Sequence, residues 1–190
     1  MMVYYVPGSG GKFLREFIAA YLKDLDFIVI NDLGVPPEAI FASVGVSHRF
    51  DGERSNANEK IIAIDYTNED INAILTLNYK KFVRRALNNT EFVNLYQGSD
   101  FIINLCNAPE EKKLEIFLKG SSESLYNDLW NIKKNISMFD LVVPFKTLLT
   151  DANLLSQQVA SFLNKSVNHQ LLQCAIRWQS ISNSLLNESR

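Results

Sequence analysis

Short apolar runs alternate along the chain with longer segments in which apolar residues recur every three or four positions. The short runs are rich in Val and Ile, which is typical of strands buried on both faces. They predict β-strands over residues 2–6, 26–30, 42–47, 60–66 and 140–145. Strands that alternate with helices indicate an α/β fold of three layers, with a mostly parallel sheet flanked by helices.

The periodic segments predict the helices. The first is expected over residues 12–23, on an apolar stripe formed by Phe13, Leu14, Phe17, Ile18, Tyr21 and Leu22. Arg15, Glu16 and Lys23 lie off this stripe. Thr67 stands three residues before Asp70, which is the spacing of a capping box and predicts the start of a second helix. Further helices are expected over residues 123–135, after Asp151, and over about residues 168–186.

Residues 7–13, which read PGSGGKF, join the first predicted strand to the first predicted helix. Glycine adopts positive φ and lets backbone amides approach an anion closely. The following helix adds its free amides and its dipole, and Lys12 adds a full charge. The segment therefore predicts an anion-binding loop at the carboxyl end of a strand, where open parallel sheets bind ligands. A tight turn that binds nothing is the alternative.

The nucleotide-binding pattern G-x-x-x-x-G-K-[ST] fits this loop only in part. Val6 stands at the position of the first Gly. Phe13 replaces the Ser or Thr that would hold Mg²⁺. The loop therefore departs from that pattern at both ends.

Composition narrows the classes of protein. The 190 residues suit one domain spanning the whole of 1–190. A net charge of −2 gives no global reason to expect a nucleic-acid partner. Two Cys and two His residues argue against a zinc site. No signal peptide is visible and no apolar run reaches about 18 residues, so we expect a cytoplasmic protein without a membrane span.

The loop resembles the donor loop of the sulfotransferases that use 3′-phosphoadenosine 5′-phosphosulfate, written Y-P-K-S-G-T-T-W-L. Residues 6–14 read VPGSGGKFL, so that Pro7, Ser9, Gly10 and Leu14 match. Phe13 takes the aromatic position. Later segments follow the family in the same order: residues 46–50 resemble K-T-H-L-P, and residues 60–70 resemble K-I-I-Y-V-x-R-N-P-K-D. Residues 141–163 resemble the family's late strand and helix.

The resemblance implies a fold like that of the P-loop nucleotide hydrolases and transfer of a sulfuryl group from a nucleotide donor, 3′-phosphoadenosine 5′-phosphosulfate, to a hydroxyl acceptor, without a metal. It implies that the donor is held by Pro7, Gly8, Ser9, Gly10, Gly11, Lys12, Phe13 and Tyr66. Lys12 would neutralise the leaving oxygen, and His48 would take the proton from the acceptor.

Three positions depart from the family pattern. Gly8 stands where the family has its loop Lys, Tyr66 where it has the Arg that grips the 3′-phosphate, and Ile74 where it has a Ser. A rebuilt 3′-phosphate site could use a basic cluster consisting of Lys80, Lys81, Arg84 and Arg85, with Arg49 and Arg54 as rivals.

Two other classes of function stay open. Residues 61–65 read IIAID and resemble a Walker B strand, so that Asp65 could hold Mg²⁺ in a nucleotide kinase or nucleotide hydrolase. Alternatively, the chain is a non-catalytic descendant that kept the sheet and the loop and binds an anion or a nucleotide.

Overall fold

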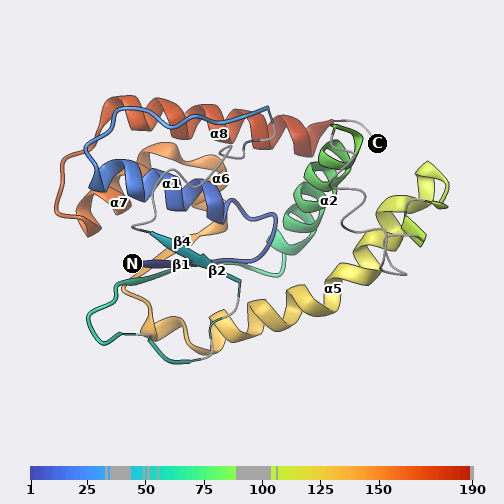
Figure 1. Ribbon diagram of the computed structural model, residues 1–190, viewed down its shortest axis with the longest axis horizontal. Helices are drawn as coiled ribbons and strands as arrows, with labels where there is room; N and C mark the ends of the chain where they lie inside the picture. The colour runs from blue at the N-terminus through green and yellow to red at the C-terminus, as the bar shows by residue number, and fades with distance from the viewer. Residues whose placement is uncertain are drawn as a thin grey trace.

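A computed structural model describes residues 1–32, 34, 44–48, 50, 52–54, 56–88, 104–105 and 107–188. Over these residues it confirms the α/β class, because a four-stranded, all-parallel sheet is flanked by helices (Figure 1). The sheet has the order β2-β1-β3-β4. The strands are β1 (Met2–Tyr4), β2 (Gly45–Ser47), β3 (Ile61–Asp65) and β4 (Leu141–Pro144).

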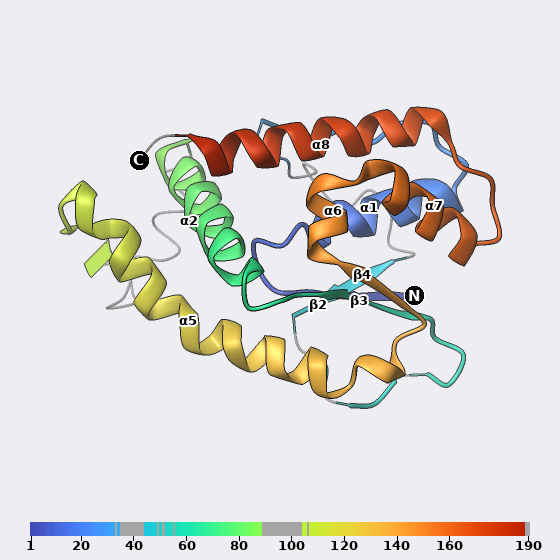
Figure 2. The same cartoon turned by 180° about the vertical axis from the view of Figure 1, so that it is seen from behind.

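The helices cover both faces of the sheet. One layer is formed by α1 (Gly11–Leu22), α6 (Phe145–Thr150), α7 (Ala152–Phe162) and α8 (His169–Asn187). Figures 1 and 2 show α5 (Glu110–Lys134) on the opposite face and α2 (Asp70–Asn88) beside the carboxyl ends of the strands. A short 3₁₀ helix, η1 (Ile136–Met138), leads into β4.

The strand order creates a topological switch between β1 and β3. The chain leaves β1 through α1 and returns to the sheet at β2, on one side. It leaves β3 through α2 and α5 and returns at β4, on the other side. Ligands of open parallel sheets bind where the connections diverge in this way. The glycine loop follows β1 and Tyr66 follows β3, so both lie at this point of the fold.

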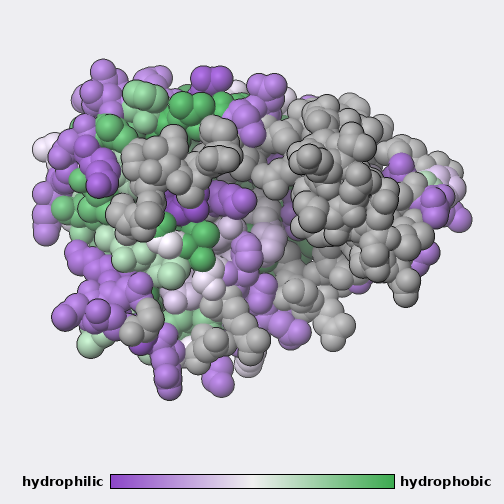
Figure 3. All heavy atoms as spheres, viewed as in Figure 1, coloured by the Kyte–Doolittle hydropathy of each residue, from purple (hydrophilic) through white to green (hydrophobic). Residues whose placement is uncertain are grey.

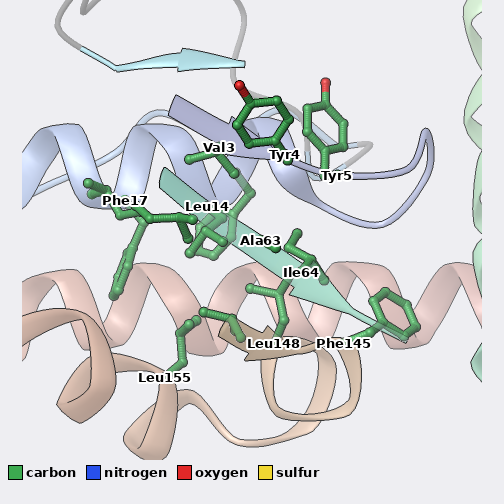
Figure 4. Packing of buried hydrophobic residues seen from close by; sticks show 14 of the residues in the cluster. Val3, Tyr4, Tyr5, Leu14, Phe17, Ala63, Ile64, Phe145, Leu148 and Leu155 are labelled. Carbon is green, nitrogen blue, oxygen red and sulfur yellow. The ribbon is translucent and has the colours of Figure 1, made fainter. Parts of the chain in front are cut away.

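The core lies between the sheet and the layer that contains α1 and α6 to α8. Figure 4 shows Val3 and Ile64 from the strands converging with Leu14 of α1, Leu148 of α6 and Leu155 of α7. All five side chains are fully buried. The packing of this layer therefore fixes α1, and with it the loop that precedes α1.

The strand predicted over residues 26–30 is wrong. The segment is not part of the sheet and runs beside α8 (Figure 1). The Ile28 N–H lies 3.5 Å from the Cys174 sulfur of that helix. Phe27 and Val29 are exposed, and apolar side chains gather on this side of the molecule in Figure 3. Inward and outward side chains alternate along this segment as they do in a strand, because any extended chain turns every second residue to the same side, here toward a helix.

The polar side of α1 differs from the prediction. Arg15 and Glu16 lie off the apolar stripe, yet they are only 8% and 2% exposed. Their side chains form an ion pair, in which Arg15 Nε lies 2.8 Å from Glu16 Oε1. Leu22, which the stripe included, is 37% exposed. The helix is buried on more than one side, and buried charges at such positions must pair.

Two helix boundaries depend on long-range contacts. α5 begins at Glu110, well before the predicted residue 123, because its first half packs on α2 through Phe117, whose ring lies 5.4 Å from that of Tyr79. By contrast, the predicted Thr67–Asp70 contact forms, since Asp70 Oδ2 accepts the Thr67 N–H at 2.7 Å, although α2 begins at Asp70 rather than directly after Thr67. None of the described helices is long and apolar enough to cross a membrane.

Asp140 links β3 to the start of β4. Its Oδ2 accepts the Ile61 N–H at 2.8 Å and the Arg54 Nη1 at 3.0 Å. Burial acts to raise the pKa of Asp140, but the hydrogen bonds from Ile61 and Arg54 outweigh it, and the pKa lies below its ordinary value of 3.8. Arg54 therefore stabilises the amino end of β4. The glycine loop lies at the opposite, carboxyl ends of the strands, so Arg54 does not rebuild a 3′-phosphate site beside the loop.

We expect Asp140→Asn to destabilise the protein most at neutral pH. Because the pKa is depressed in the folded state, the carboxylate contributes stability above its ordinary pKa of 3.8 and loses it as the pH falls through the folded-state value. The difference in unfolding free energy between wild type and variant should shrink as the pH falls below about 4, measured by urea denaturation.

The control is Glu115→Gln. Glu115 pairs with Lys119 on the exposed surface of α5, where solvent screens the interaction. This variant should differ little from wild type at any pH. An Asp140→Asn difference that stayed constant from neutral to acid pH would contradict the role given to the carboxylate.

Candidate functional site

The glycine loop packs closely against two helices. Gly8 and Gly10 have φ of 92° and 85°, in the left-handed region that favours glycine. A Cβ on Gly8 would lie 2.7 Å from the carbonyl oxygen of Ile74 and from the Cβ of Asn78, both on α2. A Cβ on Gly10 would lie 2.5 Å from Cζ2 of Trp178 on α8. These glycines therefore serve the turn and also the contact of the loop with α2 and α8.

The start of α1 lies under an aromatic ring. A Cβ on Gly11 would overlap the ring of Tyr5, the residue that follows β1. Gly10 is the N-cap and provides no side-chain hydrogen bond. Within the described part of the chain, the N–H groups of Gly10 and Gly11 form no hydrogen bond. These donors and the helix dipole are the features by which a helix N-terminus binds an anion.

Tyr66 holds the loop from inside the protein. Its hydroxyl accepts the Val6 N–H at 2.9 Å and donates to Ser9 Oγ at 2.7 Å. Ser9 Oγ in turn donates to the Val6 carbonyl oxygen at 2.6 Å. Tyr66 is 1% exposed and Ser9 is fully buried. The sequence-predicted binding residues Ser9 and Tyr66 thus meet, but their hydroxyl groups point to each other and to the backbone.

Burial raises the pKa of Tyr66 far above its ordinary value of 10.0, more than its hydrogen bonds with Ser9 and Val6 lower it. The phenol is therefore neutral over the whole physiological range. An Arg at this position would bring a positive charge, as the resemblance implies for the family. Tyr66 brings none, and its observed contacts position the loop.

His48 lies beside the loop at the end of β2. Its Nδ1 is 3.1 Å from the Tyr5 carbonyl oxygen, and the two rings pack edge to face with centroids 4.5 Å apart. A carbonyl oxygen only accepts, so Nδ1 carries the proton in this contact. In the neutral ring Nε2 is then left with a lone pair. This is the tautomer that a general base requires, and the imidazole is exposed, so that Nε2 is accessible to an acceptor hydroxyl.

The other predicted loop residues divide between surface and core. Lys12 is exposed in the first turn of α1, and Pro7 is half-buried. Phe13 is 1% exposed and stacks on Trp178, with ring centroids 4.7 Å apart and an interplanar angle of 11°. The ring of Phe13 therefore packs in the core, whereas Lys12 is directed to the surface.

The basic cluster on α2 separates into two directions. Lys80 Nζ donates to the carbonyl oxygens of Leu185 and Glu188, at the carboxyl end of α8. Lys81 is buried, and its Nζ lies 5.8 Å from the centroid of the Trp178 indole. The side chains of Arg84 and Arg85, and the whole of Arg49, lie outside the described residues. Adjacent lysines thus have different environments, which spacing in the sequence does not reveal.

Asp65, the candidate Mg²⁺ ligand, has partners within the protein. Its Oδ1 accepts the Tyr66 N–H at 2.8 Å and lies 3.4 Å from Lys133 Nζ. Among the described residues, no three or more His, Cys, Asp and Glu side chains gather as they would to hold a metal ion. The contacts of Asp65 are those of a carboxylate that ends a strand and pairs with α5.

Sequence reasoning missed the three residues that shape the loop from outside, which are Tyr5, Asn78 and Trp178. The glycines were a signal that something approaches the loop closely. However, they did not identify the neighbour, because Asn78 and Trp178 are brought to the loop by tertiary packing alone.

No family model, curated protein or solved structure matches this chain. The interpretation of the site therefore depends on the residues and contacts described above.

We expect Tyr66→Phe to destabilise the protein by about 1–3 kcal/mol, because it leaves the buried Val6 N–H without an acceptor and removes the donor to Ser9 Oγ. Chemical denaturation at neutral pH measures this loss. Tyr126→Phe makes the same chemical change at a side chain that is 53% exposed and should have almost no effect. Equal stabilities of the two variants would contradict the role of Tyr66 in the loop.

Proposed function

We propose that this chain is a sulfotransferase-like transferase of the cytoplasm, which moves a sulfuryl group from 3′-phosphoadenosine 5′-phosphosulfate to a hydroxyl acceptor. The observation that carries the proposal is the contact between His48 Nδ1 and the Tyr5 carbonyl oxygen. It fixes the tautomer that leaves Nε2 as a base, and it does so beside a glycine loop at the topological switch of the sheet.

The loop provides the anion-binding half of the site. The free N–H groups of Gly10 and Gly11 and the dipole of α1 favour a negatively charged group at this end of the helix. Lys12 adds a positive charge at the surface in the first turn. The side chains that contact the loop, those of Tyr5, Tyr66, Asn78 and Trp178, are neutral. The negative charge of the ligand is therefore balanced by the amides, the helix dipole and Lys12.

In the proposed sulfuryl transfer, each part of the site has one task. The donor, when bound, supplies an activated sulfuryl group. The loop holds this group in line with the acceptor, and such positioning is the main contribution of a protein to transfer between two oxygens. His48 Nε2 accepts the proton of the acceptor hydroxyl as the new S–O bond forms and the bond to the bridging phosphate oxygen breaks. Lys12 stabilises the negative charge that develops on the bridging oxygen.

A second candidate function is that of a non-catalytic protein that binds an anion or a nucleotide. It is favoured by the neutral, buried Tyr66 at the position where the family has its 3′-phosphate Arg. The kinase or nucleotide hydrolase alternative has no such support, since Asp65 pairs with Lys133.

Adenosine 3′,5′-bisphosphate should stabilise the protein against thermal unfolding. A ligand at 100 times its Kd adds about 2.7 kcal/mol. Differential scanning fluorimetry should show a shift in Tm with the bisphosphate, a smaller one with sulfate, and the least with ATP and Mg²⁺. Stabilisation by ATP and Mg²⁺ alone would instead support the kinase class and contradict our proposal.

We expect His48→Gln to reduce sulfuryl transfer by ~10²–10⁴-fold while leaving the Kd for the bisphosphate unchanged, because it removes the base and not the anion site. Transfer is measured with labelled donor and a panel of hydroxyl acceptors. His169→Gln, at the first residue of α8, is the matched control and should keep full activity. Transfer by His48→Gln at the wild-type rate would show that the imidazole is not the base.

A further inference from the structure

Residues 26–30 form an extended segment that runs beside α8 and is not part of the sheet (Figure 1). One contact with α8 holds the beginning of the segment, where Asp26 Oδ1 accepts the Asn168 Nδ2 at 2.9 Å. Another holds its middle, where the Ile28 N–H lies 3.5 Å from the Cys174 sulfur. The helix therefore supports the segment in an extended conformation.

The backbone of this segment has unused hydrogen-bonding groups. Apart from the Ile28 N–H, none of the N–H and carbonyl groups of residues 27–30 forms a hydrogen bond within the described part of the chain. Successive N–H groups of an extended chain point to opposite edges. Because the Ile28 N–H faces α8, the N–H groups of Phe27 and Val29 face the other edge. That edge offers the donors and acceptors with which a further strand can pair.

The side chains of the segment are those of a strand. Phe27 and Val29 are 66% and 49% exposed, whereas Ile30 is 5% exposed. Aromatic and β-branched residues at such positions favour the pairing of strands. An extended segment that combines unpaired backbone groups with exposed apolar side chains is the kind of surface on which peptides bind by strand addition.

The charges around the segment indicate which strand fits. Asp26 and Asp32 are exposed and flank the apolar residues, and no Lys or Arg stands among residues 24–34. If two copies of the chain paired antiparallel about Val29, Asp26 of each would lie opposite Asp32 of the other, and like charges at opposite positions are destabilising. A strand with cationic ends instead complements both carboxylates.

One cation lies near this edge. Arg177 of α8 lines the same hollow as Asp32, but the two form no ion pair within the described part of the chain. The carboxylate of Asp32 is therefore still available to a cationic group of a partner.

We propose that residues 26–32 bind an extended peptide strand of a protein partner, which pairs with the outer edge of the segment through backbone hydrogen bonds. Apolar residues of the partner strand pack beside Phe27 and Val29. A Lys or Arg at each of its ends faces Asp26 and Asp32. The surface does not include the glycine loop, so it is independent of the function proposed for that loop.

Synthetic peptides test the pairing without any change to the protein. The probe is a fluorescent heptapeptide with Lys at both ends and Val, Thr and Tyr between them, and fluorescence polarisation measures its Kd. N-methylation of one alternate set of its amides should weaken binding about tenfold or more, whereas methylation of the other set should be tolerated, because only one edge of the peptide faces the protein. The same peptide with Glu at both ends should bind about two- to fivefold more weakly or worse.

Variants of the protein test the edge and its charge. Val29→Pro removes the N–H at the centre of the outer edge and should abolish binding, because proline cannot donate to a neighbouring strand. Asp32→Lys should weaken binding of the Lys-ended peptide and strengthen that of the Glu-ended one. Glu115→Lys is the matched control, since it makes the same reversal of charge on the exposed surface of α5, and it should change neither.

The outcomes decide the inference. Circular dichroism identifies the folded variants, and the methylated peptides together with Asp32→Lys are sufficient if Val29→Pro does not fold. Absence of binding by the Lys-ended peptide, or equal binding of its two methylated forms, would overturn the strand pairing. Sedimentation velocity covers the other occupant: a wild-type dimer that becomes a monomer in Val29→Pro would assign the edge to a second copy of the chain and overturn the proposal.

Discussion

The buried hydroxyl of Tyr66 ties together the two central strands of the sheet at the point where their connections diverge. A phenol removed from water must find partners, and this one accepts from Val6 after β1 and donates to Ser9 in the loop. These bonds hold the loop at the end of β3, while the packing of α1 holds it from the other side. The position of the loop relative to the ends of β1 and β3 therefore depends on this link.

The parallel sheet explains why these groups meet. β1, β2 and β3 run in the same direction, so the residues that follow them gather at one edge. Tyr5, His48 and Tyr66 are each the first residue after their strands. Tyr5 has a double role, since its carbonyl oxygen holds His48 and its ring covers Gly11. The base and the anion-binding amides are therefore coupled through one residue.

The glycines have a structural explanation as well as a functional one. Gly8 and Gly10 allow α2 and α8 to approach the loop, which closes one of its sides with Asn78 and Trp178. This approach leaves no room for a lysine side chain at residue 8 of the loop.

Local pattern determined much of the fold. Strands β1, β3 and β4 and helices α1, α7 and α8 lie close to their predicted ranges, because buried Val and Ile runs and helical stripes are short-range signals. The glycine loop and His48 were visible for the same reason. Tertiary structure decided the rest: residues 26–30 lie against α8 rather than in the sheet, Arg15 and Glu16 are buried as a pair, and Tyr66 points into the loop. It also separated Lys80 from Lys81, since neighbours on a helix diverge by about 100° and only the packing of α2 between the loop and α8 gives each direction a different partner.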